Sequence, residues 1–198
     1  MTHFDQIANE WDSPEKVKLI TTTANKIKEN LELKHNLKMM DFGCGTGLLS
    51  ENFIDYSSEF LGVDTSSGML EVFNQKFKNN PNVHSKNINL EVENFKGNYD
   101  LIISSMAFHH LSTPERVLKK MKEMLNEDGK IAIVDLDKED GTFHPDNEGM
   151  GVKHFGFSED EIVSWSTECG FSVLTHSIIH KMKKNGKSYS LFLAVFEK

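Results

Sequence analysis

The sequence has little of several features that mark large classes of protein. Its two cysteines, Cys44 and Cys169, are too few for a disulfide framework, so we expect a reduced, cytoplasmic setting. No apolar run approaches the roughly 20 residues of a membrane-spanning helix, and the acidic start lacks the apolar stretch of a signal peptide. Arg116 is the only arginine and the net charge is −8, which argues against a nucleic-acid-binding face. We therefore expect neither a membrane nor a nucleic-acid partner.

Short apolar runs alternate with longer segments of helical periodicity. Runs typical of strands occur at 37–42, 60–64, 82–88, 99–104 and 130–136. This rhythm favours an α/β fold with a doubly wound parallel sheet and helices on both faces. Two further runs, 171–180 and 191–196, flank Asn185-Gly186, which is a strong hairpin signal. We therefore predict a mostly parallel seven-stranded sheet with a C-terminal antiparallel hairpin.

Helices are expected between these strands. A leading helix over 14–34 should bury Val17, Ile20, Ile27 and Leu31. Residues 48–53 should open a second helix. An apolar face at i, i+1, i+4 and i+8 predicts a third, on Met69, Leu70, Phe73 and Phe77. A fourth should begin at Pro114 and be closed by Gly129.

Two segments outside the sheet are expected to border a ligand site. The stretch 138–157 is long, polar and glycine-bearing, and it follows the fifth strand. Ligands of open α/β folds bind at that carboxyl edge, and loops of this length are often functional. Near the start, Phe4 and Trp11 either anchor an N-terminal helix or form an aromatic lid. With no linker visible, 1–198 is expected to be one domain, with 1–34 as its lid and first helix.

The strongest local signal is a glycine-rich turn after the first strand. Gly43, Gly45 and Gly47 let the backbone approach a ligand closely and adopt positive φ, and Asp41 precedes them. The helix expected to follow would offer free N–H groups. A dinucleotide fingerprint would place another glycine at position 48, where Leu48 stands.

An acid follows the second strand. Asp64 lies about 20 residues past the glycines, where a carboxylate can accept hydrogen bonds from both ribose hydroxyls. The alternative is an N-cap for the helix that starts near Ser66. The position after the second strand of a glycine-loop unit favours the ribose role.

These motifs resemble a known family. D-F-G-C-G-T-G at 41–47 and G-V-D-T-S-S-G-M-L at 62–70 look like the class I S-adenosylmethionine-dependent methyltransferases. The similarity continues at 99–111, at 125–131 and at 157–161 with 169–171, so that it covers roughly 37–198. The opening 4–12 is similar to the lid of the small-molecule, methyltransferase type 11/25-like subgroup. Together the motifs are specific for the superfamily and not for a substrate.

The resemblance implies S-adenosyl-L-methionine as cofactor, S-adenosyl-L-homocysteine as product and a small-molecule acceptor. The implied cofactor-binding residues are Asp41, Gly43, Cys44, Gly45, Thr46, Gly47, Asp64, Thr65, Met69, Asn89, Leu90 and Ser104. After the third strand the family usually has an acid that contacts adenine. Here the candidates are Asn89 or Asn87, whose amide still offers an acceptor oxygen.

Methyl transfer from a sulfonium mainly requires alignment and exclusion of water. A general base helps only when the acceptor must lose a proton. Candidate bases are His109 after the fourth strand, His144 and His154 in the 138–157 loop, and, more weakly, His110. Because these histidines show no ligand spacing such as H-x₃-H, no metal site is predicted.

Two other functions stay open at this stage. One is a nicotinamide-dependent oxidoreductase, which Leu48 and the terminal antiparallel pair disfavour. The other is a protein that binds S-adenosylmethionine without catalysis, because fold alone does not fix function.

Overall fold

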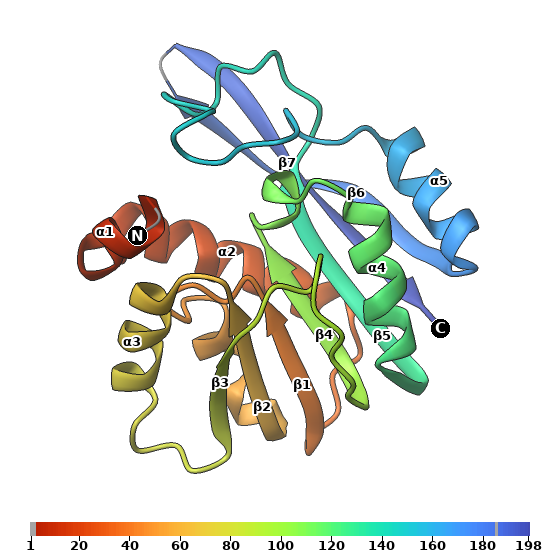
Figure 1. Ribbon diagram of the computed structural model, residues 1–198. Helices are drawn as coiled ribbons and strands as arrows, with labels where there is room; N and C mark the ends of the chain where they lie inside the picture. The colour runs from red at the N-terminus through yellow and green to blue at the C-terminus, as the bar shows by residue number, and fades with distance from the viewer. Residues whose placement is uncertain (1–2, 185) are drawn as a thin grey trace.

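The computed structural model describes residues 3–184 and 186–198, without the side chains of 172–174. Its centre is one seven-stranded sheet in the order β3-β2-β1-β4-β5-β7-β6 (Figure 1). The strands are β1 (Leu37–Phe42), β2 (Ser57–Asp64), β3 (Val83–Asn87), β4 (Tyr99–Ser105), β5 (Leu125–Leu136), β6 (Ser172–Lys184) and β7 (Lys187–Glu197). The first five are parallel, and β7 is antiparallel to β5 and β6. The predicted fold class is confirmed; Asn185 of the predicted turn lies outside the described residues.

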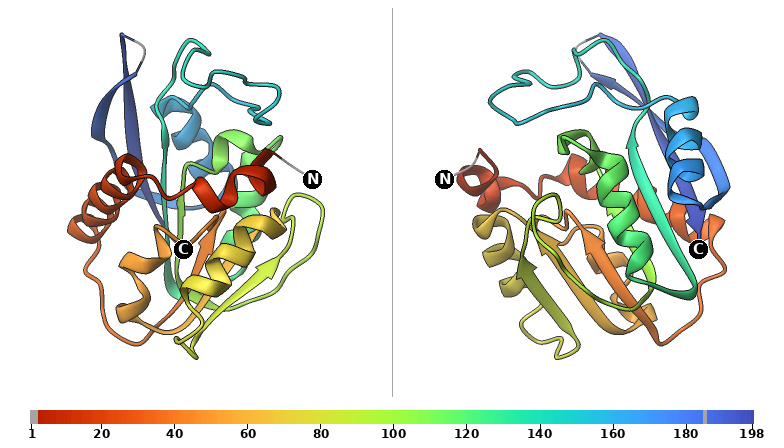
Figure 2. Two further views of the ribbon diagram at one scale, coloured as in Figure 1. Left: turned by 90° about the vertical axis from the view of Figure 1, so that its left-hand side faces the viewer. Right: turned by 45° about the vertical axis from the view of Figure 1, so that its right-hand side comes forward.

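Helices cover both faces of the sheet (Figures 1 and 2). They are α1 (His3–Ile7), α2 (Pro14–Asn30), α3 (Ser67–Lys76), α4 (Pro114–Glu123) and α5 (Glu159–Cys169), with 3-10 turns η1 (Ala8–Glu10), η2 (Ser50–Asn52), η3 (Ile54–Tyr56) and η4 (Phe108–His110). The apolar faces of α2 and α3 pack into one buried cluster, and those of α4 and α5 pack into a second. Burial on both faces explains why the central strands are continuous apolar runs.

The connection from β1 to β2 differs from the prediction. Residues 48–53 were expected to open a helix, and the chain instead forms the short turns η2 and η3. Residues 48–56 would advance only about 14 Å as an α-helix. The strand β1, along which they must return, is about 20 Å long. A more extended connection is therefore required, so the glycine turn is not followed by a helix dipole.

Two smaller predictions are also wrong. Val17 was expected to be buried and is 41% exposed, because it lies in the first turn of α2 while the buried positions of that helix come later. Gly129 was expected to close α4, which already ends at Glu123. Gly129 lies inside β5, where a Cβ would come within 2.9 Å of the carbonyl oxygen of Tyr99.

Candidate functional site

The glycine turn folds over the carboxyl end of β2. The backbone N–H groups of Gly43 and Cys44 both donate to the Val63 carbonyl, at 2.8 and 3.1 Å. Gly43, Gly45 and Gly47 have φ values of +70°, +52° and +85°. A Cβ at Gly43 would come within 2.4 Å of the Ala107 Cβ, so the turn after β4 lies directly against the loop.

Asp64 ties this loop to the start of α3. Its Oδ2 accepts from the Gly45 N–H and its Oδ1 from the Ser66 N–H, both at 2.8 Å. Ser66, not Asp64, is the N-cap, because its Oγ accepts from the Met69 N–H. Burial raises the pKa of Asp64, and the hydrogen bonds from Ser66 and Gly45 partly oppose this. Each carboxylate oxygen keeps a further lone pair for a ligand hydroxyl.

Asp41 presents a buried carboxylate at the end of β1. It is 1% exposed, and its Oδ2 accepts from the Ser50 hydroxyl at 2.6 Å. Its Oδ1 finds no hydrogen-bond partner among the described residues. Burial raises the pKa of Asp41 to about 7, against the lowering effect of the Ser50 bond. A buried acceptor without a partner is costly, so this oxygen fits a cationic donor such as the ammonium group of S-adenosylmethionine.

The other cofactor-side residues vary in accessibility. Met69 is buried, with its Sδ 3.9 Å from a Cβ built at Gly45, whereas Thr65 is exposed. Thr46 is buried, and its hydroxyl donates to Asp12. Cys44 is buried, which raises the pKa of its thiol well above the usual value and fits a space-filling role.

The candidates for the adenine contact and for the end of β4 have protein partners. Asn89 Oδ1 accepts from the Glu91 N–H at 2.9 Å, and the neighbouring Leu90 is 1% exposed. Asn87 donates to the Thr65 carbonyl at 3.0 Å. Ser104 is fully buried, and its hydroxyl donates to the Phe42 carbonyl, which ties β4 to β1.

The N-terminal segment docks on the glycine loop and on α3 (Figure 2). Asp5 Oδ1 accepts from the Ser66 hydroxyl at 2.6 Å and from the Gly68 N–H at 3.0 Å. Asp12 pairs with Lys76 at 2.9 Å as well as accepting from Thr46. Sequence reasoning missed both acids, because their partners are remote in the chain.

Phe4 extends this docking toward the histidines. Its ring packs edge-on against Trp11, with centroids 5.7 Å apart, and against His110 at 5.3 Å. These contacts anchor the N-terminal segment, and Phe4 also covers His110 in the turn after β4. The alternative role of the aromatic pair, as a lid over the cofactor, stays a prediction.

His109 is oriented by a buried carboxylate. It lies in η4, and its Nδ1 is 2.6 Å from Oδ1 of Asp135, which is fully buried in β5. Asp135 Oδ2 also accepts from the backbone N–H groups of Phe108 and His109. Burial acts to raise the pKa of Asp135, but the charge and hydrogen bond of His109 hold it below the usual value. The remaining nitrogen, Nε2, is buried and has no partner within the described chain.

Two more histidines surround His109. The ring centroid of His109 lies 4.1 Å from that of His110 and 5.0 Å from that of His144. Burial, reinforced by His109, lowers the pKa of His110 to about 3 and that of His144 to about 4. Both rings are therefore neutral at pH 7. We call His109, His110 and His144 the three-histidine cluster.

His154, the third candidate base, is separate from this cluster. Its backbone N–H donates to the His109 carbonyl at 3.0 Å, as does that of Lys153 at 2.9 Å, so the 138–157 loop is fixed to η4. Its ring packs on Phe157, with centroids 5.1 Å apart. Sequence spacing did not indicate that His144 lies beside His109, because the fold of the 138–157 loop brings His144 to the turn after β4.

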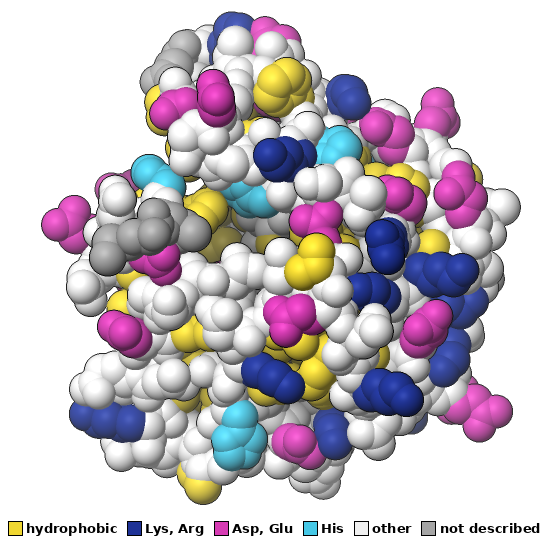
Figure 3. Space-filling model, in the orientation of Figure 1, with side chains coloured by type: hydrophobic (Ala, Val, Ile, Leu, Met, Phe, Trp, Pro, Cys, Tyr) yellow, Lys and Arg dark blue, Asp and Glu magenta, His cyan; other side chains and the backbone are white. Residues whose placement is uncertain are grey.

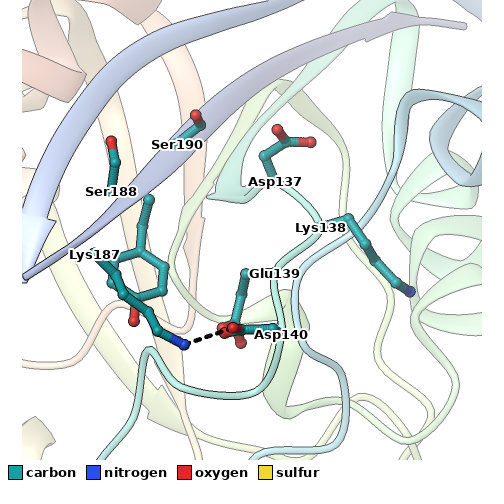
Figure 4. A pocket seen from close by; sticks show the side chains of 8 residues that line it. Asp137, Lys138, Glu139, Asp140, Lys187, Ser188 and Ser190 are labelled. Carbon is teal, nitrogen blue, oxygen red and sulfur yellow. Dashed lines mark hydrogen bonds and ion pairs between the residues drawn. The ribbon is translucent and has the colours of Figure 1, made fainter.

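The surface is hollowed between the 138–157 loop and α1, with histidine and hydrophobic side chains at the rim (Figure 3). A separate open groove of about 370 Å³ lies farther out, between residues 137–140 and 187–190 (Figure 4). Its walls are polar, and Lys187 pairs with Asp140 across it at 2.6 Å. Because the groove is lined by neither the glycine loop nor the cluster, it is a poor candidate for the reaction site.

Comparisons with known proteins agree with this geometry. A methyltransferase domain family model matches residues 40–131. An uncharacterized methyltransferase of Schizosaccharomyces pombe is 32% identical over 142 residues, covering 64% of this chain and 50% of the relative. A malonyl-[acyl-carrier protein] O-methyltransferase of Acetivibrio thermocellus is 30% identical over 135 residues, covering 66% and 47%. The chain thus spans about half the length of these relatives.

The fold has close counterparts among solved structures. The crystal structure of a SAM-dependent methyltransferase from Aquifex aeolicus superposes with a TM-score of 0.76 at 21% identity, covering 98% of this chain and 97% of that one. Within the described residues, no helix is both long and apolar enough to cross a membrane. The glycine loop, the acids near the ends of β1 and β2, the sheet order and these relatives agree with one another. Residues 40–131 match a methyltransferase domain, and the relatives and the shared fold support a class I S-adenosylmethionine-dependent methyltransferase, whose cofactor is S-adenosyl-L-methionine.

Proposed function

We propose that this chain transfers a methyl group from S-adenosyl-L-methionine to a small-molecule acceptor that binds beside the three-histidine cluster. The observation that carries the proposal is the contact between the glycine loop and the turn after β4, where Gly43 meets Ala107 two residues before His109. Cofactor-side and acceptor-side groups are thereby adjacent. The cofactor supplies an electrophilic methyl group on its sulfonium.

The cofactor would be held by groups from three strand ends. Asp41 Oδ1 would accept from the ammonium group, and Asp64 would accept from the ribose hydroxyls while keeping its bonds to the loop. Gly43 and Gly45 would let the methionine part lie against backbone. Asn89 and Leu90 follow β3, where the adenine would lie.

Among His109, His144 and His154, His109 fits the role of base best. Its Nδ1 is held by Asp135, so the ring cannot turn freely, and Nε2 remains to accept a proton. The ring of His144, whose centroid lies 5.0 Å from that of His109, is a weaker base because its pKa is lowered to about 4. His154 packs on Phe157. We therefore assign the base role to His109.

An oxygen acceptor is favoured. Several relatives are named O-methyltransferases, for malonyl-[acyl-carrier protein] and for ubiquinone biosynthesis. A hydroxyl must lose its proton on methylation, which gives the His109–Asp135 pair a task. Residues 138–157 would close the acceptor side and residues 1–34 would act as lid and first helix of a single domain. The free thiols of Cys44 and Cys169 agree with a cytoplasmic setting.

The test is transfer of labelled methyl groups from S-adenosyl-L-methionine to pools of small hydroxylated metabolites. The proposal predicts label in at least one acceptor and S-adenosyl-L-homocysteine as coproduct. The same pools with His109→Ala should lose most of the label, whereas His84→Ala, an exposed site on β3, should not. Tight cofactor binding without transfer to any pool would favour the non-catalytic alternative.

A further inference from the structure

We propose that His109, His110 and His144 bind one divalent transition-metal ion through three imidazole nitrogens, with a coordination position left open for the acceptor oxygen. The binding of the ion stands on this structure alone. The assignment of the open position to an acceptor rests on the proposed function.

The three side chains lie close enough together to form such a site after small rotations. One ring nitrogen from each residue lies within 4.8 Å of the other two. Nitrogens that bind zinc at about 2.0–2.1 Å in a tetrahedral site are about 3.4 Å apart. Side-chain rotations that move each nitrogen by about 1 Å close this difference. Two residues come from η4 and the third from the 138–157 loop.

Two of the rings are held as metal-binding histidines usually are. The Nδ1 of His109 is 2.6 Å from the Asp135 carboxylate, and the Nδ1 of His110 is 3.3 Å from the Gly151 carbonyl. Ligand histidines commonly donate their second N–H to a carboxylate or carbonyl, which fixes the tautomer and aims the other nitrogen at the ion. This pattern leaves the Nε2 atoms of His109 and His110 as the ligand atoms.

The cluster also leaves buried nitrogens without a protein partner. His109 Nε2 and His144 Nδ1 are both buried, and neither has a hydrogen-bond partner in the described part of the chain. Buried polar atoms in native proteins are nearly always satisfied. An ion would satisfy His109 Nε2 directly and would draw His144 into a defined orientation.

The chemistry of the donors selects the kind of ion. Three neutral imidazoles suit zinc, cobalt, nickel, copper or iron(II) and are poor ligands for magnesium or calcium, which prefer oxygen. Asp135 supplies a negative charge behind His109, while Lys184 is the nearby cation that acts on His144. Three protein ligands with one open position is the usual form of a catalytic zinc site.

An ion here would change how the proposed reaction removes a proton. The Nε2 of His109 would then be a ligand, and the positive charge would lower the pKa of an acceptor hydroxyl at the open position, so that its proton could pass to solvent before methyl transfer. The ion would also link His144 in the loop to η4, reinforcing the bonds that the His109 carbonyl receives from Lys153 and His154. The Nε2 of His109 would thus act as the base in the metal-free chain and as a ligand in the metal-bound chain.

The experiment measures metal binding by the full chain, purified without a histidine tag and treated with chelator. Zn²⁺ and Co²⁺ are titrated by calorimetry, and the Co²⁺ samples are followed by visible absorption. We expect one ion per chain and a tetrahedral Co²⁺ spectrum. His144→Ala should weaken binding at least tenfold and abolish the spectrum, and Asp135→Asn should weaken it. His84→Ala, an exposed histidine outside the cluster, should bind as the unaltered chain does.

Two outcomes would overturn the proposal. One is no stoichiometric binding to the unaltered chain, and the other is equal binding by the unaltered chain and by His144→Ala. Circular dichroism shows whether each variant is folded, and His110→Gln serves as a second cluster variant if His144→Ala is not. S-adenosyl-L-methionine is titrated into the same metal-free samples. Cofactor binding without metal binding defeats only the metal site, and the reverse defeats the proposed function.

Discussion

The carboxylate of Asp135 holds the imidazole of His109 at 2.6 Å, with both side chains almost completely buried. Asp135 is itself fixed by backbone N–H groups of Phe108 and Leu136, at 2.9 and 2.7 Å. The turn η4 after β4 therefore supplies the imidazole, and β5 supplies the carboxylate that orients it. This pairing explains why an acid occurs inside the apolar run of β5.

The pair predicts a loss of turnover without a loss of cofactor affinity. His109→Ala should lower kcat about 100-fold or more if it acts as base, and Asp135→Asn should lower it at least about tenfold. S-adenosyl-L-methionine affinity should change less than about twofold, because the hydrogen bonds of these two side chains run between η4 and β5 and not to the glycine loop. Calorimetry and steady-state kinetics on the same samples check this, and equal loss in both quantities would argue for a purely structural role.

Asp64 should be required for cofactor binding. Asp64→Ala removes the acceptor of the Gly45 and Ser66 N–H groups as well as the proposed ribose contact. Hydrogen bonds to a charged group contribute about 1.5–3 kcal/mol, so the Kd for S-adenosyl-L-methionine should rise at least about tenfold. Asp55→Ala, an exposed acid in η3, is the matched control and should leave the Kd unchanged. An unchanged Kd in Asp64→Ala would remove the ribose role.

Gly47 should be intolerant of a side chain. A Cβ there would lie 2.5 Å from the Phe77 ring and 2.8 Å from that of Phe73, on a residue with φ of +85°. Left-handed strain costs about 1–2 kcal/mol and overpacking about 1–3 kcal/mol. Gly47→Ala should thus lose about 2–5 kcal/mol of unfolding free energy in urea. Gly151→Ala has φ of +70° with open space around it, so it should lose only the strain.

Asp41 should make the folded chain less stable as pH rises toward 7. Its pKa in the folded chain is about 7, against 3.8 for an ordinary aspartate. Between these values the folded chain holds a proton that the unfolded chain has released, so this group destabilises the fold increasingly as pH rises toward 7. Asp41→Asn cannot titrate and should gain stability relative to the unaltered chain, by about 2–3 kcal/mol more at pH 8 than at pH 5. Urea unfolding at both pH values measures this, and a pH-independent difference would contradict it.

Local sequence patterns contain most of the fold. Apolar runs and turn signals located all seven strands, most clearly β1, β4, β5 and β7, whose residues are mostly buried. The connection after Gly47 was mispredicted, because its length, not its composition, prevents a helix. The exposure of Val17 depends on how far α2 extends along the sheet. Neither the form of this connection nor the exposure of Val17 can be predicted from a local sequence pattern.

The candidate site was predictable where it follows strand ends. Asp41, Asp64 and His109 each end or follow a parallel strand, so the sheet itself brings them to one edge. His144 is different, because its position depends on a loop whose backbone bonds to His109 cross more than 40 residues of sequence. Sequence spacing therefore gave no sign of the three-histidine cluster.

The most direct test of the central claim is calorimetric titration of the chain with S-adenosyl-L-methionine, S-adenosyl-L-homocysteine and NAD in parallel. The account predicts micromolar binding of the two sulfur compounds, one per chain, and no binding of NAD. Asp64→Ala should raise the Kd of both sulfur compounds together, by at least about tenfold. Binding of NAD, or of none of the three, would contradict the assignment of the glycine loop to this cofactor.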